Sequence, residues 1–441
     1  MPPRPRKRFR TSATTSTPGP TIPHEIVLEI VARSDFTAIV RSAASCRPLR
    51  RDIVRPAFVR RVFHGPGGGG VPRRVLAFLH AYDEARVGPP PAALSLAHPA
   101  TPAAAHFLDK NLAPFVSRDA AASGGLLGDY EPLTSRNGLV VLRRRYVCRR
   151  RRRRDLCVYN PMTGVRVFLP VPPDMDIVRA SGYGVSSTYV LLTAADGAGG
   201  SFLLLAADFA GLKEHSDRFL VQTFSPDDAG GGKWGAVTAA RHPRSAGCDL
   251  LPLSGAVVLG GLIHWLMQTF DFEVYGFEFH VLTYDVGTAA AGSVELPAEA
   301  LPDNCVASSL HLAPSPDGRL SLLVADRLTV SVWLLAGGGW SRHAMVDTAG
   351  MLAPSLPPEW PQWWWRAGAI RLAASSGARS GAILLRPFTG WYDDLEKESG
   401  EGLAVLDVEK EEMRVVNRRN HTMNFPYEVD LELQLSAMKI F

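Results

Sequence analysis

The sequence predicts a mainly β protein, in which a short N-terminal segment of three helices precedes a β-propeller-like domain. Three observations predict this fold class. From about residue 73, short apolar runs recur every 10–15 residues or so between turn residues. The chain is rich in turn formers, with 40 Gly and 34 Pro among 441 residues. A weak internal repeat also recurs along the same region.

The apolar runs identify the expected strands of the large domain. Each run is four or more β-forming residues long or is bounded by Gly, Pro, Asp or Asn. The expected strands are Leu139–Leu142, Leu156–Tyr159, Val165–Leu169, Tyr189–Thr193, Phe202–Ala206, Phe219–Phe224, Val257–Leu259, Val281–Tyr284, Leu320–Val324, Val330–Leu335, Ala382–Leu385 and Leu403–Leu406.

The repeat favours a propeller over a sandwich or barrel. Its five copies begin at Leu156, Leu220, Leu282, Val330 and Leu403, and each pairs a strand and turn with a second strand. A small sheet cannot bury both of its faces alone, so neighbouring sheets would pack radially. With the less patterned region 75–135 as one more unit, we expect six blades, closed by a strand near Leu431–Leu435.

The N-terminal segment divides into three parts. Residues 1–20 are basic and poor in large apolar residues, which predicts a disordered tail. Its run Arg4–Arg10 fits a nuclear import signal and a solvated tail equally well. Residues 21–63 carry helical apolar spacing and predict three short helices whose small core needs a partner for stability. Residues 64–72 are a Gly/Pro linker.

Charge and cysteine usage exclude several classes. The net charge of +5 is concentrated in the tail and in a run of nine arginines between Arg143 and Arg154, so a nucleic-acid partner is disfavoured. Five cysteines without a C-x-x-C pair indicate a reducing compartment and predict no disulfide framework, metal or cofactor. The uncharged stretch Leu250–Phe270 contains Gly260-Gly261, which favours a buried hairpin over a membrane-spanning helix.

Residues 22–58 resemble the F-box, the adaptor-docking motif of F-box proteins. Two departures are His24, where an acidic residue is common, and Leu49, where the family often has Trp. The residues that carry the resemblance are Ile22-Pro23, Ile26, Leu28-Glu29-Ile30, Arg33, Ile39-Val40-Arg41, Ser45-Cys46-Arg47, Arg50 and Pro56-x-Phe58.

Residues 73–441 resemble the β domain that follows the box in plant F-box proteins, especially those of grasses. The phrases that carry this second resemblance include Ser135-Arg-Asn-Gly, Tyr159-Asn-Pro-Met-Thr-Gly, Val258-Leu-Gly-Gly-Leu-Ile-His-Trp, Ser315-Pro-Asp-Gly-Arg-Leu and Phe425-Pro-Tyr-Glu-Val-Asp-Leu.

The resemblance implies a substrate-recognition subunit of a ubiquitin ligase in the nucleus or cytoplasm, with no membrane association. The box would dock a Skp-type adaptor and through it a cullin–RING complex, while the β domain holds an unknown protein target. Catalysis is then proximity, and no residue of the chain needs to do covalent chemistry. The candidate adaptor contacts are Ile22, Pro23, Ile26, Ile30, Ile39, Val40 and Leu49; the alternative for each is a place in the helical core, and we expect a mixture.

Two clusters are candidates for contact with the target. Trp360, Trp363 and Trp364 lie in a Pro-rich stretch. They are candidates because tryptophans are enriched at interface hot spots, although packing between blades explains them as well. Arg150 and Arg152 lie in the arginine run, whose alternative is a solvated loop tip. Two other functions remain open: an adaptor-independent interaction scaffold, and a basic nucleic-acid binder.

Overall fold

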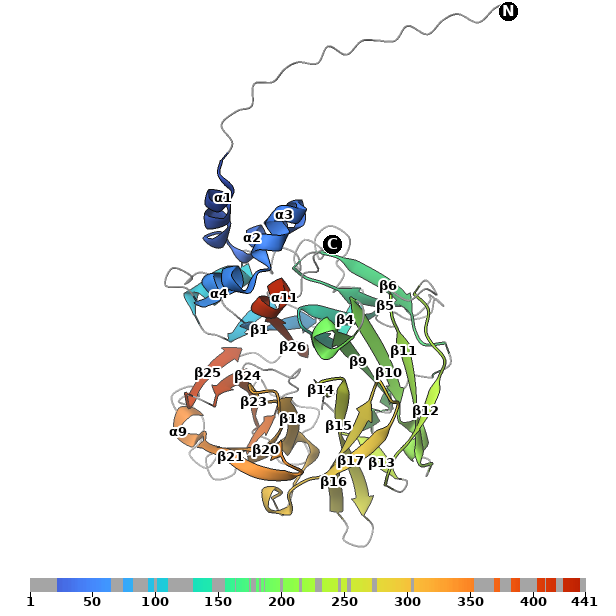
Figure 1. The fold of residues 1–441 in the computed structure, drawn as a ribbon. Helices are drawn as coiled ribbons and strands as arrows, with labels where there is room; N and C mark the ends of the chain where they lie inside the picture. Colours follow the sequence, from blue (N-terminus) through green and yellow to red (C-terminus); the bar gives the residue numbers. More distant parts are fainter. Residues whose placement is uncertain are drawn as a thin grey trace, which may run out of the picture.

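The computed structural model shows helices at the N-terminus and a ring of β-sheets behind them (Figure 1). It describes residues 22–64, 74–81, 94–98, 101–109, 130–144, 155–352, 369–372, 382–388, 403–417 and 423–436, with internal gaps at 163, 174, 176–179, 182–183, 186, 199–200, 214–215, 227–231, 245–246, 252–254, 272–275, 303–304 and 409. Residues 1–20, the linker 64–72 beyond its first residue, and much of 75–135 lie outside these ranges.

Four helices form the N-terminal segment, where the sequence predicts three: α1 (His24–Ala32), α2 (Phe36–Ser45), α3 (Arg47–Ile53) and α4 (Pro56–His64). Asp35 caps α2, because its carboxylate accepts a hydrogen bond from the Ala38 amide at 2.8 Å. The unexpected helix is α4. Pro56 is its first residue, a position where the missing N–H of proline costs nothing.

Five sheets of four or more strands make a five-bladed propeller arrangement (Figure 1). The first blade consists of β3 (Tyr130–Arg136), β4 (Leu139–Arg144), β5 (Asp155–Tyr159) and β6 (Arg166–Pro170), and the second of β9 (Ser187–Thr193), β10 (Phe202–Asp208), β11 (Arg218–Phe224) and β12 (Thr238–Arg241). The third consists of β13 (Cys248–Leu250), β14 (Val257–Leu259), β15 (Leu262–Asp271), β16 (Gly276–Asp285) and β17 (Ala291–Glu295), joined by β7 (Ala180–Ser181) and β8 (Gly184–Val185). The fourth consists of β18 (Leu310–Pro314), β19 (Leu320–Asp326), β20 (Thr329–Ala336) and β21 (Gly339–Asp347), and the fifth of β22 (Ala369–Leu372), β23 (Ala382–Phe388), β24 (Leu403–Asp407) and β25 (Glu412–Asn417).

The predicted count of six blades is wrong. Each of the five repeat copies falls on the outer part of one blade, so the repeat itself gave the right number. The region 75–135 contributes β1 (Arg74–Ala81) and β2 (Leu94–His98), which form a three-stranded sheet with β26 (Met423–Asp430) in the order β2-β1-β26. β26 therefore belongs to this separate sheet and to none of the five blades, and the expected closing strand Leu431–Leu435 is the helix α11 (Leu431–Ser436) instead.

The uncharged stretch Leu250–Phe270 forms the predicted hairpin. Val257–Leu259 and Leu262–Asp271 pair in antiparallel register around Gly260 and Gly261, whose φ angles are +57° and +83°. Both angles lie in the left-handed region that glycine enters without strain, and they match the twist of a two-residue hairpin. Within the described residues, no helix is long and apolar enough to span a bilayer.

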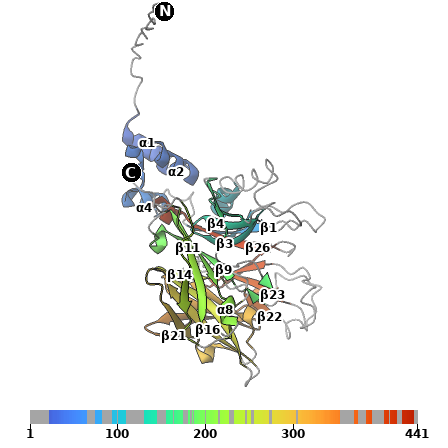
Figure 2. The same ribbon diagram turned by 90° about the vertical axis from the view of Figure 1, so that its right-hand side faces the viewer.

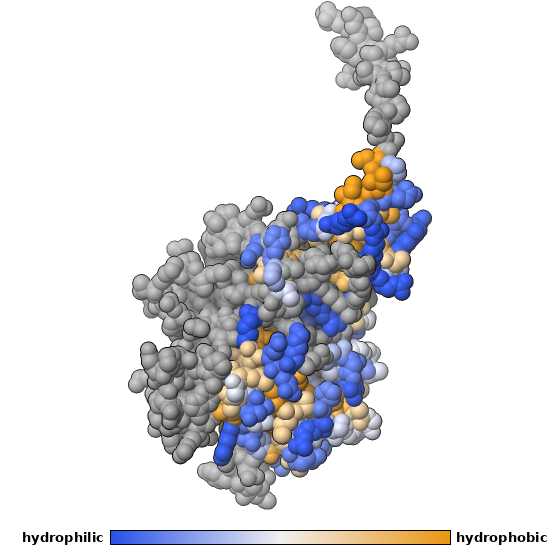
Figure 3. Space-filling model, turned by 90° about the vertical axis from the view of Figure 1, so that its left-hand side faces the viewer, coloured by the Kyte–Doolittle hydropathy of each residue, from blue (hydrophilic) through white to orange (hydrophobic). Residues whose placement is uncertain are grey.

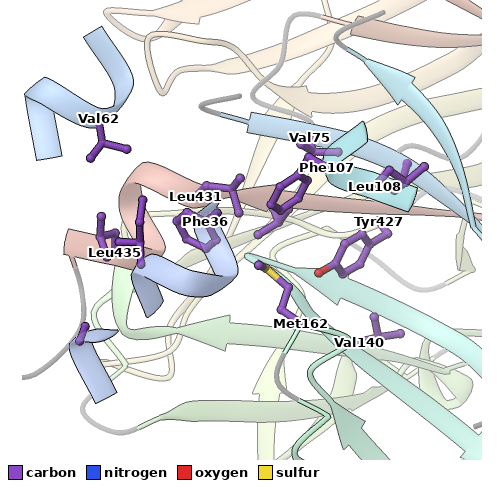
Figure 4. Close-up of a cluster of buried hydrophobic side chains, with 14 of the residues drawn as sticks. Phe36, Val62, Val75, Phe107, Leu108, Val140, Met162, Tyr427, Leu431 and Leu435 are labelled. Atoms are coloured by element: carbon purple, nitrogen blue, oxygen red, sulfur yellow. The ribbon is translucent and has the colours of Figure 1, made fainter. Parts of the chain in front are cut away.

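The N-terminal helices share one hydrophobic core with the β domain (Figure 4). Phe36 on α2 is completely buried and packs edge-on against Phe107 of α5 (Pro102–Phe107), with ring centroids 6.1 Å apart. Leu431 and Leu435 of α11 belong to the same core. The helices are thus not an isolated core, because they pack with α5 and α11 of the same chain. That their core needs a partner for stability stays a prediction.

Consecutive blades are held together by apolar seams and by two tryptophans. The Trp234 indole N–H donates to the Pro170 carbonyl of the preceding blade at 2.8 Å, and that of Trp340 donates to the Glu295 carbonyl of its preceding blade at 2.7 Å. The smaller elements fill the connections: η2 (Ala194–Asp196), α8 (Ala210–Lys213), η3 (Ala298–Ala300), η4 (Ala307–Ser309) and α9 (Ala349–Leu352).

Candidate docking surface on the N-terminal helices

The helix α1 carries an exposed apolar stripe. Ile22, Ile26 and Ile30 keep 61%, 50% and 55% of their surface exposed. Ile26 and Ile30 are four residues apart on α1 and share one helix face, whereas Ile22 lies two residues before the helix begins. Figure 3 shows this stripe as an orange patch on the N-terminal helices, at the top of the molecule. The opposite face of α1 is buried: Val31 is only 6% exposed and belongs to the core shared with the β domain.

Ion pairs fix the orientation of α1 on its neighbours. The His24 Nε2 atom lies 2.6 Å from the Asp52 carboxylate of α3, and Glu29 pairs with Arg61 of α4. Exposed pairs of this kind contribute little to stability. Here they act from both sides of α1 and, together with the buried Val31, leave the isoleucine stripe facing solvent.

The seven candidate adaptor contacts divide into two groups. Ile22, Pro23, Ile26 and Ile30 are exposed and can reach a partner. Ile39 and Leu49 are 0% and 9% exposed and lie in the core, and Val40 is partly buried against the same core. The assignment of Ile39 and Leu49 as direct contacts is therefore wrong, because a buried α2 or α3 residue can act on a partner only through its neighbours.

The candidate target contacts Trp360, Trp363, Trp364, Arg150 and Arg152 lie outside the described residues. Within those residues, a pocket of about 260 Å³ opens between the fourth and fifth blades. Ser315, Asp317 and Arg319, which belong to one of the phrases that carry the family resemblance, are among its lining residues, and the sequence did not predict the pocket.

The pocket is mainly apolar and has one charged edge. Leu323 and Ile383 are among its lining residues, and Asp317 and Arg319 stand at the rim. Hydrogen bonds from Arg319 and Ser315 lower the pKa of Asp317 to about 2, so its carboxylate is ionised and already paired. The volume is below the roughly 300 Å³ at which small-molecule sites begin, so the pocket has room for about one apolar side chain.

The comparison with known families adds one assignment. The family described as Domain of unknown function (DUF7595) matches residues 100–441. This chain belongs to that family. The DUF7595 match spans all five blades, β26 and α11, whereas α1–α4 and β1 precede it. The paired strands β1 and β26 thus tie the segment before the DUF7595 match to the end of the match.

Two of the solved structures that resemble this chain have low sequence identity to it. A quinonprotein alcohol dehydrogenase-like protein from Bacteroides thetaiotaomicron is 10% identical, with 80% of this chain and 78% of that chain covered and a TM-score of 0.34. An α-L-arabinanase from Penicillium chrysogenum is 13% identical, with 64% and 76% covered and a TM-score of 0.32. Scores this low carry no argument about the DUF7595 chain. No curated protein matches it.

Proposed function

We propose that this chain is the non-catalytic substrate-recognition subunit of a ubiquitin ligase, with α1–α4 docking a Skp-type adaptor and the propeller holding the target. The observation that carries the proposal is the isoleucine stripe of α1. Ile26 and Ile30 on one face of α1, with Ile22 just before the helix, are large apolar side chains that are costly to expose, and a helix of this kind typically lies in an apolar groove of a partner. The F-box resemblance identifies the partner, a Skp-type adaptor that leads to a cullin–RING complex.

The docking energy follows from the exposed surface. Complete burial of an isoleucine side chain contributes about 1.5–3 kcal/mol. Ile22, Ile26 and Ile30 each still have about half of their surface to bury. Together they would contribute about 3–4 kcal/mol on that scale, which corresponds to two or three decades in the dissociation constant.

The test is adaptor binding by the full chain. The variant Ile22→Ala/Ile26→Ala/Ile30→Ala and the unmodified chain are titrated with a purified Skp-type adaptor by calorimetry, and we expect the variant to bind at least about 100-fold more weakly. Met345→Ala is the matched control. Met345 is 62% exposed on β21, away from the helices, so its loss should leave binding unchanged.

Two results would contradict the proposal. The first is an unmodified chain that does not bind the adaptor or co-purify with the cullin. The second is a triple variant that binds as tightly as the control, which would place the adaptor elsewhere. Adaptor-independent capture of a partner by the propeller would then be the better account. In the proposed complex the chain contributes no catalytic group, and it works in the nucleus or cytoplasm.

A further inference from the structure

Three buried side chains with metal-binding atoms meet at the seam between the second and third blades. His242 directly follows β12, Cys248 opens β13, and His280 lies on β16. One ligand atom of each lies within 4.8 Å of the other two. The two Nε2 atoms of the histidines are 3.1 Å apart. All three residues are at most 2% exposed.

The sheet register explains why Cys248 and His280 share a face. Cys248 is paired with Thr269 of β15, and His280 is paired with Met267 of the same strand. Residues 267 and 269 are two apart and therefore point to the same face of the sheet, so their cross-strand partners do too. His242 reaches this face from the second blade. The sequence did not show the cluster, because 32 residues and a central strand separate Cys248 from His280.

The donor set is one that zinc binds. Tetrahedral zinc takes imidazole nitrogen at about 2.0–2.1 Å and thiolate sulfur at about 2.3 Å, so neighbouring donors lie about 3.3–3.6 Å apart. The nitrogen atoms of His242 and His280 already have nearly this separation. The sulfur of Cys248 needs to move by at most about 1 Å, within the reach of a side-chain adjustment.

The surroundings of the cluster orient the His242 ring. The Nδ1 atom of His242 lies 3.0 Å from the Arg244 amide nitrogen and 3.1 Å from the Arg244 carbonyl oxygen, so the backbone of Arg244 orients the ring. Coordination through Nε2 requires the tautomer in which Nδ1 donates to that carbonyl. The positive charge of Arg244 is offset by Glu278 and Glu295, with which it pairs.

The cluster leaves a polar group unsatisfied. The Nδ1 atom of His280 is buried and has no hydrogen-bond partner among the described residues. A buried nitrogen without a partner costs about 1–3 kcal/mol. Such exceptions in a well-packed interior call for a cause. An ion between the two Nε2 atoms would not itself contact this Nδ1 atom, so the orphaned nitrogen shows only that the polar groups of the seam are incompletely satisfied.

We propose that His242, Cys248 and His280 form a binding site for Zn²⁺ that joins the second and third blades. The fourth position is filled by water or by the hydroxyl of Thr269, which lies 3.1 Å from the Cys248 sulfur. Binding releases the thiol proton to solvent, since the thiolate is the ligand. The site is closed and structural, and it does not depend on adaptor docking.

The experiment uses Co²⁺ as a spectroscopic substitute for Zn²⁺ on the full chain after chelator treatment. We expect saturation at one Co²⁺ per chain, with a thiolate-to-cobalt charge-transfer band and d–d bands of tetrahedral intensity. Zn²⁺ should then displace Co²⁺ and raise Tm. Cys248→Ser should remove the charge-transfer band, and His280→Gln should weaken binding at least tenfold, in line with the loss of one of three protein ligands.

Cys305→Ser is the matched control, because Cys305 is a free cysteine outside the cluster. It should keep the full charge-transfer band. If a variant fails to fold, the presence or absence of the charge-transfer band in the unmodified chain still tests the site. An unmodified chain that gives no thiolate band at micromolar Co²⁺ would overturn the site, as would a Cys248→Ser protein that keeps the band.

Discussion

The buried ion pair between Arg136 and Asp196 is the contact whose loss should cost most. Arg136 ends β3 of the first blade, and Asp196 lies just after β9 of the second. The Arg136 guanidinium donates to the Asp196 carboxylate, with Nε to Oδ2 at 2.7 Å, and to the Val258 carbonyl of the third blade at 2.9 Å. One side chain therefore joins three blades.

The magnitude of the loss follows from burial. The side chains of Arg136 and Asp196 are 13% and 1% exposed, so water cannot replace a missing partner. In Arg136→Met, the Asp196 carboxylate keeps only its hydrogen bonds from Thr193. Removal of one partner of a buried pair costs about 3–5 kcal/mol, and we expect the free energy of unfolding at pH 7 to fall by about that amount.

The loss of stability caused by Arg136→Met should be smaller in acid. Burial acts to raise the pKa of Asp196, but Arg136 and Thr193 more than offset burial and hold the pKa below its usual value of 3.8. In the intact protein the pair therefore stabilises the fold above the unfolded-state pKa, and this is lost as pH falls through the folded-state pKa. Without Arg136, burial raises the pKa of Asp196, so acid protonates and relieves the stranded carboxyl group.

Urea unfolding at pH 7 and pH 4.5 measures both effects. Arg61→Met is the control for losing an arginine, because its pair with Glu29 is exposed and should contribute under about 1 kcal/mol. The double variant Arg136→Met/Asp196→Asn should recover part of the loss. A deficit for Arg136→Met no larger than that of the control, or equal at both pH values, would refute the reasoning.

Three further predictions test the seams. Trp340→Phe keeps an aromatic ring but loses the hydrogen bond from the indole to the Glu295 carbonyl, so thermal unfolding should show a free energy of unfolding lower by about 0.5–1.5 kcal/mol. A change near zero would show that this hydrogen bond does not hold the two blades together. Leu435→Ala should cost about 2–5 kcal/mol and speed hydrogen exchange in α2 and α4, and unchanged exchange there would disprove the shared core. Burial lowers the pKa of His264, so below about pH 6.5 the unfolded chain binds more protons than the folded one and the free energy of unfolding falls with falling pH. His264→Gln should make this pH dependence of stability less steep. An unchanged pH dependence would exclude His264 as its source.

Much of the fold was predictable because its signals are local. The turn pair Gly260-Gly261 fixed a hairpin without any knowledge of the sheet, and each strand carries its own apolar run. The five repeat copies gave the blade number. The error of a sixth blade arose because β1 pairs with β26, more than 340 residues away, and such a long-range pairing leaves no periodic signal in the sequence.

The candidate docking surface was predictable only in part. The spacing of Ile22, Ile26 and Ile30 defines a helix face, but spacing alone does not say which apolar face is buried. Ile39 and Leu49 belong to equally apolar patterns and are buried, in a core that also contains Phe107 and residues of α11. The cluster at His242 could not be predicted, since three chain segments meet there only in the folded sheet.

The shared core has a consequence for the proposed function. A receptor that works by proximity must hold its target at a set distance from the adaptor, and a mobile joint between the two would dilute that effect. In this chain α1–α4 share one core with β1, β26 and α11 and stand at one end of the molecule, where α11 lies beside α4 and β1 (Figures 1 and 2). Phe36 and Leu435 come from opposite ends of the sequence and are packed in one core. The position of an adaptor on α1 relative to the blades would therefore be fixed by core packing, so that core substitutions such as Leu435→Ala should impair target ubiquitination more than they impair adaptor binding.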